Sequence, residues 1–120
     1  MIVRVHHVQI TVPRDAEAAA RRFYCGVLGL TEVAKPAVLA VRGGFWLQVG
    51  DVQVHVGLED GVVRAGSRAH VAYEVDSLTE WQERLSRAGI VVEDGESLPD
   101  YARREFRDPF GNRVELLARR

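Results

Sequence analysis

Apolar and polar residues alternate along the segment HVQITV, which runs from His7 to Val12. Because successive side chains of a β-strand point to opposite faces, the alternation predicts a strand with one apolar face for packing against a helix and one polar face. By this parity His6 points with the apolar residues, and we interpret it as a structural histidine at the strand edge. His7 points with Gln9 and Thr11, on the side where a ligand could be bound.

The pattern then changes to a helical period. Residues 13–30, PRDAEAAARRFYCGVLGL, begin with proline and aspartate, have an alanine-rich middle and reach Gly29, where a helix would stop. Apolar residues recur at four-residue spacing, so one face of the helix is predicted to be buried. That face consists of Ala19, Phe23 and Val27.

Three short strand-like segments follow the helix. We expect strands at Val38–Val41, Phe45–Val49 and Val52–Leu58, with hairpin turns at Gly43-Gly44 and Gly50-Asp51. In the last strand the apolar residues share one face, and Gln53 and His55 lie opposite them. The first half of the chain therefore has the order β-α-β-β-β.

The second half repeats this order. We expect a strand from His70, followed by a helix that begins after Asp76-Ser77 and stops at Gly89. The helix is expected to bury Leu78, Trp81 and Leu85. Strands should follow at Ile90–Glu93 and Arg103–Arg107, and a last strand should begin at Arg113 after the turn DPFGN. HVQITV and HVAYEV lie 63 residues apart, and His55 lies 60 residues before Glu115. The sequence therefore predicts an α+β fold of two tandem βαβββ modules, at residues 1–60 and 69–120, joined by a linker at about 61–68.

Composition narrows the class of protein. A chain of 120 residues with 47% hydrophobic residues can bury a core. Its 16 basic and 17 acidic residues form no block of one sign, which argues against a nucleic-acid or polybasic membrane partner. Cys25 is the single cysteine, so no internal disulfide is expected, and no signal peptide or membrane span is evident. We expect a cytoplasmic protein with a small-molecule substrate.

The polar faces of four predicted strands carry candidate metal ligands. A solvated face would favour Lys, Glu, Arg and Thr, yet these positions hold three of the four histidines and one glutamate: His7, His55, His70 and Glu115. Imidazole and carboxylate groups suit zinc, nickel, cobalt, iron or manganese. Each half supplies one residue from its first strand and one from its last. An ordinary solvated outer face of a sheet remains the alternative.

The same parity adds candidate substrate-binding residues. They are Gln9, Trp46, Gln48, Gln53, Glu74 and Arg113, together with Tyr101 and Arg103 or Arg104 from the segment YARREF. For Trp46 the alternative is a residue that packs on the sheet, and for the arginines it is a solvated edge. Glu115 is the only carboxylate among the candidate ligands, so it is also the candidate general base.

The chain resembles the vicinal oxygen chelate superfamily, which is also called the glyoxalase, bleomycin resistance protein and dioxygenase family. The resemblance lies in four stretches that follow one another in the family's order: HHVQITVP, RRFYCGVLGL, HVAYEV and FRDPFGNRVELL. The resemblance implies that the curved mixed sheets of the two modules form a cup-shaped metal and substrate site, held by His7, His55, His70 and Glu115. It also implies a homodimer, because the two modules of a cup often come from different chains in this family.

Two functions follow from the resemblance. The first is a metal-dependent lyase, isomerase or extradiol-type dioxygenase that chelates a small oxygenated substrate through neighbouring oxygens. His55 stands where glyoxalase I has a glutamate, so the chain departs from glyoxalase I at this position. The second is a metal-free protein of the same fold that binds or sequesters a small molecule such as an antibiotic.

Overall fold

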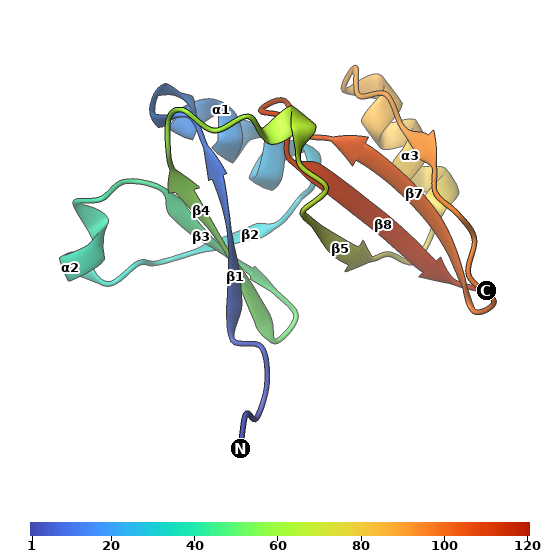
Figure 1. Ribbon diagram of the computed structural model, residues 1–120, viewed down its shortest axis with the longest axis horizontal. Coiled ribbons are helices and arrows are strands. Elements are labelled where there is room, and N and C mark those ends of the chain that lie inside the picture. Colours follow the sequence, from blue (N-terminus) through green and yellow to red (C-terminus); the bar gives the residue numbers. More distant parts are fainter. The chain divides into compact units, whose positions relative to one another are not determined.

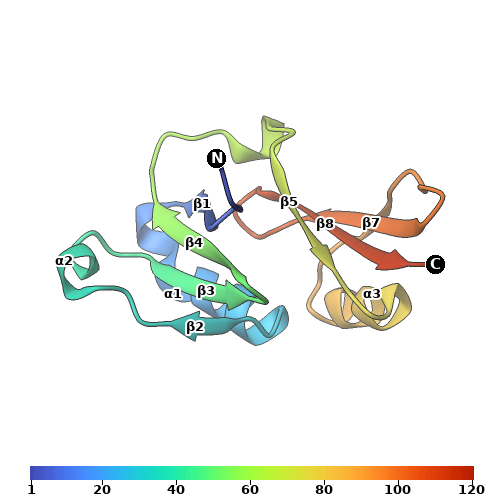
Figure 2. The same cartoon turned by 90° about the horizontal axis from the view of Figure 1, so that it is seen from below.

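The computed structural model describes residues 1–120 and divides into two units, Met1–Val62 and Val63–Arg120. Each unit is one four-stranded mixed sheet with its main helix against one face (Figures 1 and 2). The strand order is β1-β4-β3-β2 in the first unit and β5-β8-β7-β6 in the second. The predicted α+β fold of two tandem modules is confirmed.

In the first unit, strand β1 leads through a helical segment to strands β2, β3 and β4. The elements are β1 (His7–Val12), η1 (Arg14–Ala16), α1 (Glu17–Arg21), η2 (Arg22–Val27), β2 (Thr31–Val33), α2 (Ala37–Ala40), β3 (Phe45–Val49) and β4 (Val52–Leu58). Strand β1 pairs with β4 in parallel, and the other pairs are antiparallel. The apolar face predicted for β4 is part of the core, because Val54 and Val56 are buried.

The helical segment buries a face one residue out of phase with the prediction. Phe23 is buried as predicted, but the other buried residues are Ala16, Ala20, Tyr24 and Leu28, whereas Ala19 and Val27 are half-buried. The four-residue period was correct. The segment starts as a 3₁₀ turn and ends as a π-helix, and these changes of pitch shift which side meets the sheet.

The strand predicted at Val38–Val41 is wrong. This segment contains the short helix α2, and the strand that pairs with β3 at this edge of the sheet is β2, earlier in the chain. Pro36 in an extended conformation starts the helical turn, and alanine and leucine favour it. The turn Gly43-Gly44 therefore ends this helix and makes no hairpin, whereas Gly50-Asp51 does join β3 to β4.

The second unit follows its prediction more closely. Its elements are η3 (Arg64–Gly66), β5 (His70–Glu74), α3 (Leu78–Arg87), β6 (Glu93–Asp94), β7 (Tyr101–Arg107) and β8 (Arg113–Arg119). The side chain of Ser77 caps α3 by accepting a hydrogen bond from the backbone N–H of Glu80 at 3.3 Å. Leu78 and Leu85 are buried, and Trp81 is half-buried.

The strand predicted at Ile90–Glu93 is shorter than expected. Only Glu93–Asp94 pairs with β7, because Ile90 belongs to the C-terminal cap of α3. Its backbone N–H donates to the carbonyl of Leu85 at 2.9 Å, and Gly89 has a φ of 77°.

Gly44 lies where a side chain cannot fit. Its φ is +82°, and a Cβ atom there would lie 2.2 Å from the carbonyl oxygen of Val56 in β4. Gly44→Ala should lower the free energy of unfolding by roughly 3 kcal/mol, measured by urea denaturation. Gly50→Ala is the matched control, because Gly50 also has a positive φ but has no neighbouring atom within 4 Å, so its cost should stay near ~1 kcal/mol. Equal losses would contradict this account.

Candidate functional site

The polar face of the first unit carries a stack of three rings from three neighbouring strands. The His55 ring of β4 lies between His7 of β1, with ring centroids 4.1 Å apart and planes 14° apart, and Trp46 of β3, at 4.0 Å and 3°. The register explains the contact with Trp46, since Trp46 pairs directly with His55. His55 is buried between its two neighbours.

His6 does not face the helix as predicted. It precedes β1, is exposed, and its Nδ1 lies 3.0 Å from Nδ1 of His7, with the two rings edge to face. The parity of a strand does not extend to His6, because the strand begins at His7. His6 therefore belongs to the polar cluster around His7.

Two glutamine side chains set the proton position on His55. The amide of Gln48 donates to the carbonyl of Gly50 at 2.8 Å, so its oxygen accepts from the amide of Gln53 at 3.2 Å. The oxygen of Gln53 then accepts from Nε2 of His55 at 2.9 Å. This order of donors and acceptors assigns the proton of the neutral ring to Nε2 and leaves Nδ1 as the free ligand nitrogen.

Burial, together with the smaller effects of the neighbouring charges of His7, His6 and Lys35, lowers the pKa of His55 from 6.5 to about 4. The ring is therefore neutral at pH 7. A pocket of about 630 Å³ opens over this face, and its lining includes Gln9, His7, Trp46 and His55 but neither Gln48 nor Gln53. The last two residues act through the hydrogen bonds that orient His55.

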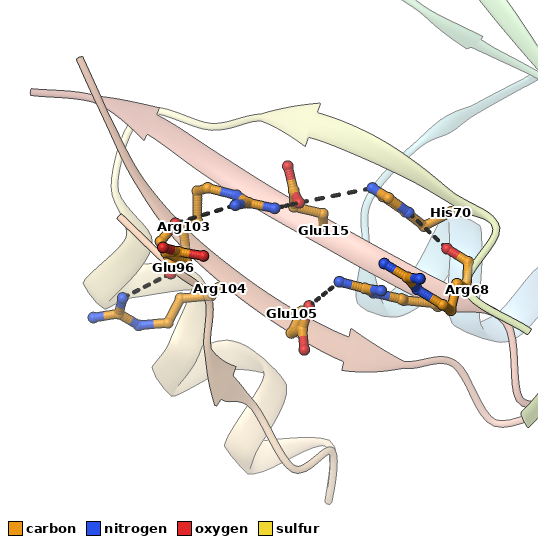
Figure 3. A network of polar contacts seen from close by, with 8 residues as sticks. Arg68, His70, Glu96, Arg103, Arg104, Glu105 and Glu115 are labelled. Atoms are coloured by element: carbon orange, nitrogen blue, oxygen red, sulfur yellow. Dashed lines mark hydrogen bonds and ion pairs between the residues drawn. The ribbon is translucent and has the colours of Figure 1, made fainter. Parts of the chain in front are cut away.

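In the second unit, His70 of β5 and Glu115 of β8 lie close together (Figure 3). Nε2 of His70 is 3.7 Å from Oε1 of Glu115, and its Nδ1 donates to the carbonyl of Arg68 at 2.9 Å. A carbonyl can only accept, so the proton of the neutral ring is on Nδ1 and the lone pair of Nε2 faces the carboxylate. Glu115 is buried, with 5% of its surface exposed.

Arg103 of β7 is the third member of this cluster (Figure 3). Its Nη2 donates to Oε1 of Glu115, and its Nη1 donates to the carbonyl of Glu96 at 3.1 Å. The hydrogen bond to Glu115 raises the pKa of Arg103 above its usual value. The guanidinium is therefore a fixed positive charge beside the buried carboxylate.

The other predicted site residues of the second unit are engaged elsewhere. Arg113 donates to Glu105 at 2.5 Å, and Arg104 points to Gln82 of α3 and to Asp94. Glu74 forms an ion pair with Arg119 at 3.4 Å, and the same guanidinium lies over the ring of Tyr101.

Comparison with known proteins gives the family. The sequence model of the Glyoxalase/Bleomycin resistance protein/Dioxygenase superfamily matches residues 4–116. The chain belongs to this superfamily. A crystal structure of a glyoxalase family protein from Bacillus anthracis is 38% identical and has a TM-score of 0.91, with 100% of this chain and 98% of that chain covered.

More distant structures share the fold of this superfamily member. TnmS3, an antibiotic binding protein from Streptomyces sp. CB03234, is 24% identical with a TM-score of 0.75, covering 99% of this chain and 98% of that one. Lactoylglutathione lyase from Agrobacterium tumefaciens is 21% identical with a TM-score of 0.73, covering 98% and 95%. No curated protein matches the sequence.

Members of the superfamily commonly use divalent metals, and the two pairs of candidate ligands in this chain differ in how well they fit an ion. Two ligands of one zinc ion lie at most about 4 Å apart, which the 3.7 Å between His70 and Glu115 satisfies. The rings of His7 and His55 are stacked, so their in-plane lone pairs run parallel and one ring must turn before both can reach one ion. No group of three or more His, Cys, Asp or Glu side chains forms a metal cluster.

The sequence pattern did not indicate some of the residues that lie around these two sites. Lys35 and Arg42 line the first-unit pocket, and they flank the segment Val38–Val41 that was expected to be a strand. Glu105 lies directly opposite Glu115 in the register, and strand parity could have found it. The ion pair between Arg103 and Glu115 joins residues on neighbouring strands, which only the register of β7 with β8 reveals.

Metal-free protein should lose stability as the pH falls from about 6.5 to about 4. In this window the unfolded chain protonates His55 and the folded protein does not, so the contribution of His55 is complete above pH 6.5 and is lost toward pH 4. The loss should reach up to about 3 kcal/mol, since one pKa unit corresponds to about 1.4 kcal/mol. Urea unfolding across this range, with a chelator present, measures it. In His55→Gln this part of the pH dependence should disappear, and an unchanged slope would refute the assignment.

Proposed function

We propose that the protein is a metal-dependent enzyme of its superfamily, of the lyase, isomerase or dioxygenase type, which acts on a small molecule through two neighbouring oxygens. The observation that carries this proposal is the orientation of His70. In the neutral ring the lone pair of Nε2 faces the carboxylate of Glu115 at 3.7 Å, so two electron donors face each other. A cation between them relieves this repulsion, and a hydrogen bond from the other ring nitrogen to a carbonyl is typical of metal-binding histidines.

His70 and Glu115 would hold the ion, with His7 and His55 as the further ligands from a first module. The ion would be Zn, Ni, Co, Fe or Mn, all of which accept nitrogen and carboxylate ligands. When bound, it supplies a Lewis acid that stabilises negative charge on a substrate oxygen.

Side chains of the protein would also transfer the proton and contact the substrate. Arg103 holds Oε1 of Glu115, and Oε2 makes no hydrogen bond, so Oε2 is the atom that would take a proton from the substrate. Gln9 and Trp46 line the pocket of the first module and would contact the substrate. Glu74, Tyr101 and Arg113 remain candidate substrate contacts only if their present ion pairs open.

A second candidate function is metal-free binding of a small molecule, such as an antibiotic. It is favoured by the ion pair of Arg103 with Glu115 and by the stacking of His7 on His55, since both arrangements are stable without an ion. TnmS3, which shares the fold, is an antibiotic binding protein.

Metal titration separates the two functions. Protein purified without a chelating tag should bind a divalent ion, measured by elemental analysis and calorimetry. His70→Ala and Glu115→Gln should each weaken binding by at least about tenfold, because each removes one ligand. A screen of substrates with vicinal oxygens on the reconstituted protein should then find a reaction that Glu115→Gln abolishes.

Two further variants make this titration specific. Glu74→Gln is the matched control in the same sheet, and its affinity should not change. Arg103→Met should bind the ion more tightly, because it removes a positive charge that competes for Glu115. Protein that neither contains nor takes up metal would overturn the enzyme proposal and favour the binding protein.

We also propose that the protein is a homodimer, because each module carries only two of the four candidate ligands and modules of different chains often combine in this family. Light scattering coupled to size-exclusion chromatography should give twice the mass of the 13.4 kDa chain. A mass of one chain at micromolar concentration would contradict this prediction.

A further inference from the structure

The pocket over the ring stack of the first unit carries an excess of positive charge. Arg14, Lys35 and Arg42 are among its lining residues, and no acidic residue is. The guanidinium groups of Arg14 and Arg42 are exposed and make no hydrogen bond or ion pair in the structure. Lys35 is half-buried, and its Nζ donates to the carbonyl of Gly43 at 2.6 Å, which fixes the ammonium at the rim of the pocket.

Two carboxylates that bind backbone groups at or next to pocket-lining residues, Glu17 and Asp60, are already engaged. Glu17 accepts from the backbone N–H of Gly44 at 2.5 Å and from Arg21 at 3.3 Å. Asp60 accepts from the backbone N–H of Arg14 at 3.0 Å and does not bind its guanidinium. The three cations therefore lack a partner carboxylate within the unit, although they converge on one pocket.

Part of the remaining wall of the pocket is apolar, beside the polar side chains of His6, His7 and Gln9. Leu39, Val41 and Leu58 line it, and Val41 is 89% exposed, an unusual degree for an aliphatic residue beside a pocket. The ring of Trp46 adds an aromatic surface, with the His55 ring stacked on it at a centroid distance of 4.0 Å. A ligand with an apolar body would cover this wall while its charged end meets the cations.

We propose that this pocket binds a small organic anion with an apolar body, whose carboxylate or similar acidic group is held by Arg42, Lys35 and Arg14. This inference rests on the proposed function for one point only, namely that the anion is the substrate. The pocket itself lies within the first unit, so the binding can be tested without metal.

Cyclohexanecarboxylate and its uncharged counterpart cyclohexanecarboxamide are suitable probes, since they differ mainly in charge. The test uses full-length Trp81→Phe protein with a chelator, so that Trp46 is the single tryptophan and its indole N–H signal reports binding by NMR titration. The carboxylate should shift this signal and bind at least about tenfold more tightly than the amide, because a charged hydrogen bond is stronger than a neutral one. Added salt should weaken only the carboxylate.

Charge variants assign the effect to these residues. Arg42→Gln, Lys35→Gln and Arg14→Gln should each weaken carboxylate binding by about threefold or more and leave the amide unchanged, and the triple variant should lose the preference. Arg87→Gln on α3 is the matched control and should change neither. Equal affinities for the two probes, or equal effects of Arg42→Gln and Arg87→Gln, would overturn the inference.

The outcomes also distinguish this inference from the proposed function. If metal binds but the carboxylate shows no preference, only the anion pocket is refuted. If the carboxylate binds as expected but the protein takes up no metal, the enzyme proposal fails and the pocket stands as that of a binding protein.

Discussion

The parallel pairing of a first strand with a last strand is the constraint on which both candidate sites depend. In the first unit β1 pairs with β4, so that His7 lies opposite Gln53 and Gln9 lies opposite His55. In the second unit β5 pairs with β8 in the equivalent register, with His70 opposite Arg113 and Ala72 opposite Glu115. Each pair of candidate ligands is therefore a diagonal pair across one parallel ladder. Because the helix covers the other face of the sheet, a slip of one residue would bury these side chains in the core.

Within each pair of candidate metal ligands, hydrogen bonds to neighbouring groups decide which ring nitrogen of the histidine carries the proton and which has a free lone pair. The carbonyl of Arg68 places the proton of neutral His70 on Nδ1, and Gln53 places that of His55 on Nε2. These two choices are opposite, although His70 and His55 serve the same predicted role. The second unit therefore offers a lone pair beside a carboxylate, whereas the first offers a neutral ring stacked between two others. The proton positions favour a metal centred on His70 and Glu115.

Strand parity alone predicted the faces of β1, β4, β5 and β8, and the repeat predicted the order of the elements. Both succeeded because a period of two is enforced by the backbone and needs no knowledge of distant partners. The prediction of secondary structure and of side-chain partners failed where contacts between distant residues, or a competing local conformation, determine the structure. The valine-containing segment after Pro36 forms the helix α2, and β2, earlier in the chain, pairs with β3 in its place. The pairing of Arg103 with Glu115 and of Glu74 with Arg119 depends on register and side-chain direction, which one sequence does not specify.

The two modules share one architecture and differ in charge. At the equivalent position, the first module buries His55 and the second buries Glu115, and each is satisfied by a neighbour of matching chemistry, Gln53 or Arg103. The polar face of the second module consists largely of arginine and glutamate in ion pairs, so its charges are balanced internally. The first module leaves the charges of Arg14 and Arg42 unpaired beside an apolar wall. Buried charge must be compensated, whereas exposed unpaired charge persists at little cost in water. The first module is therefore the one whose charge is available for an external anion, and the second is the one suited to hold a cation.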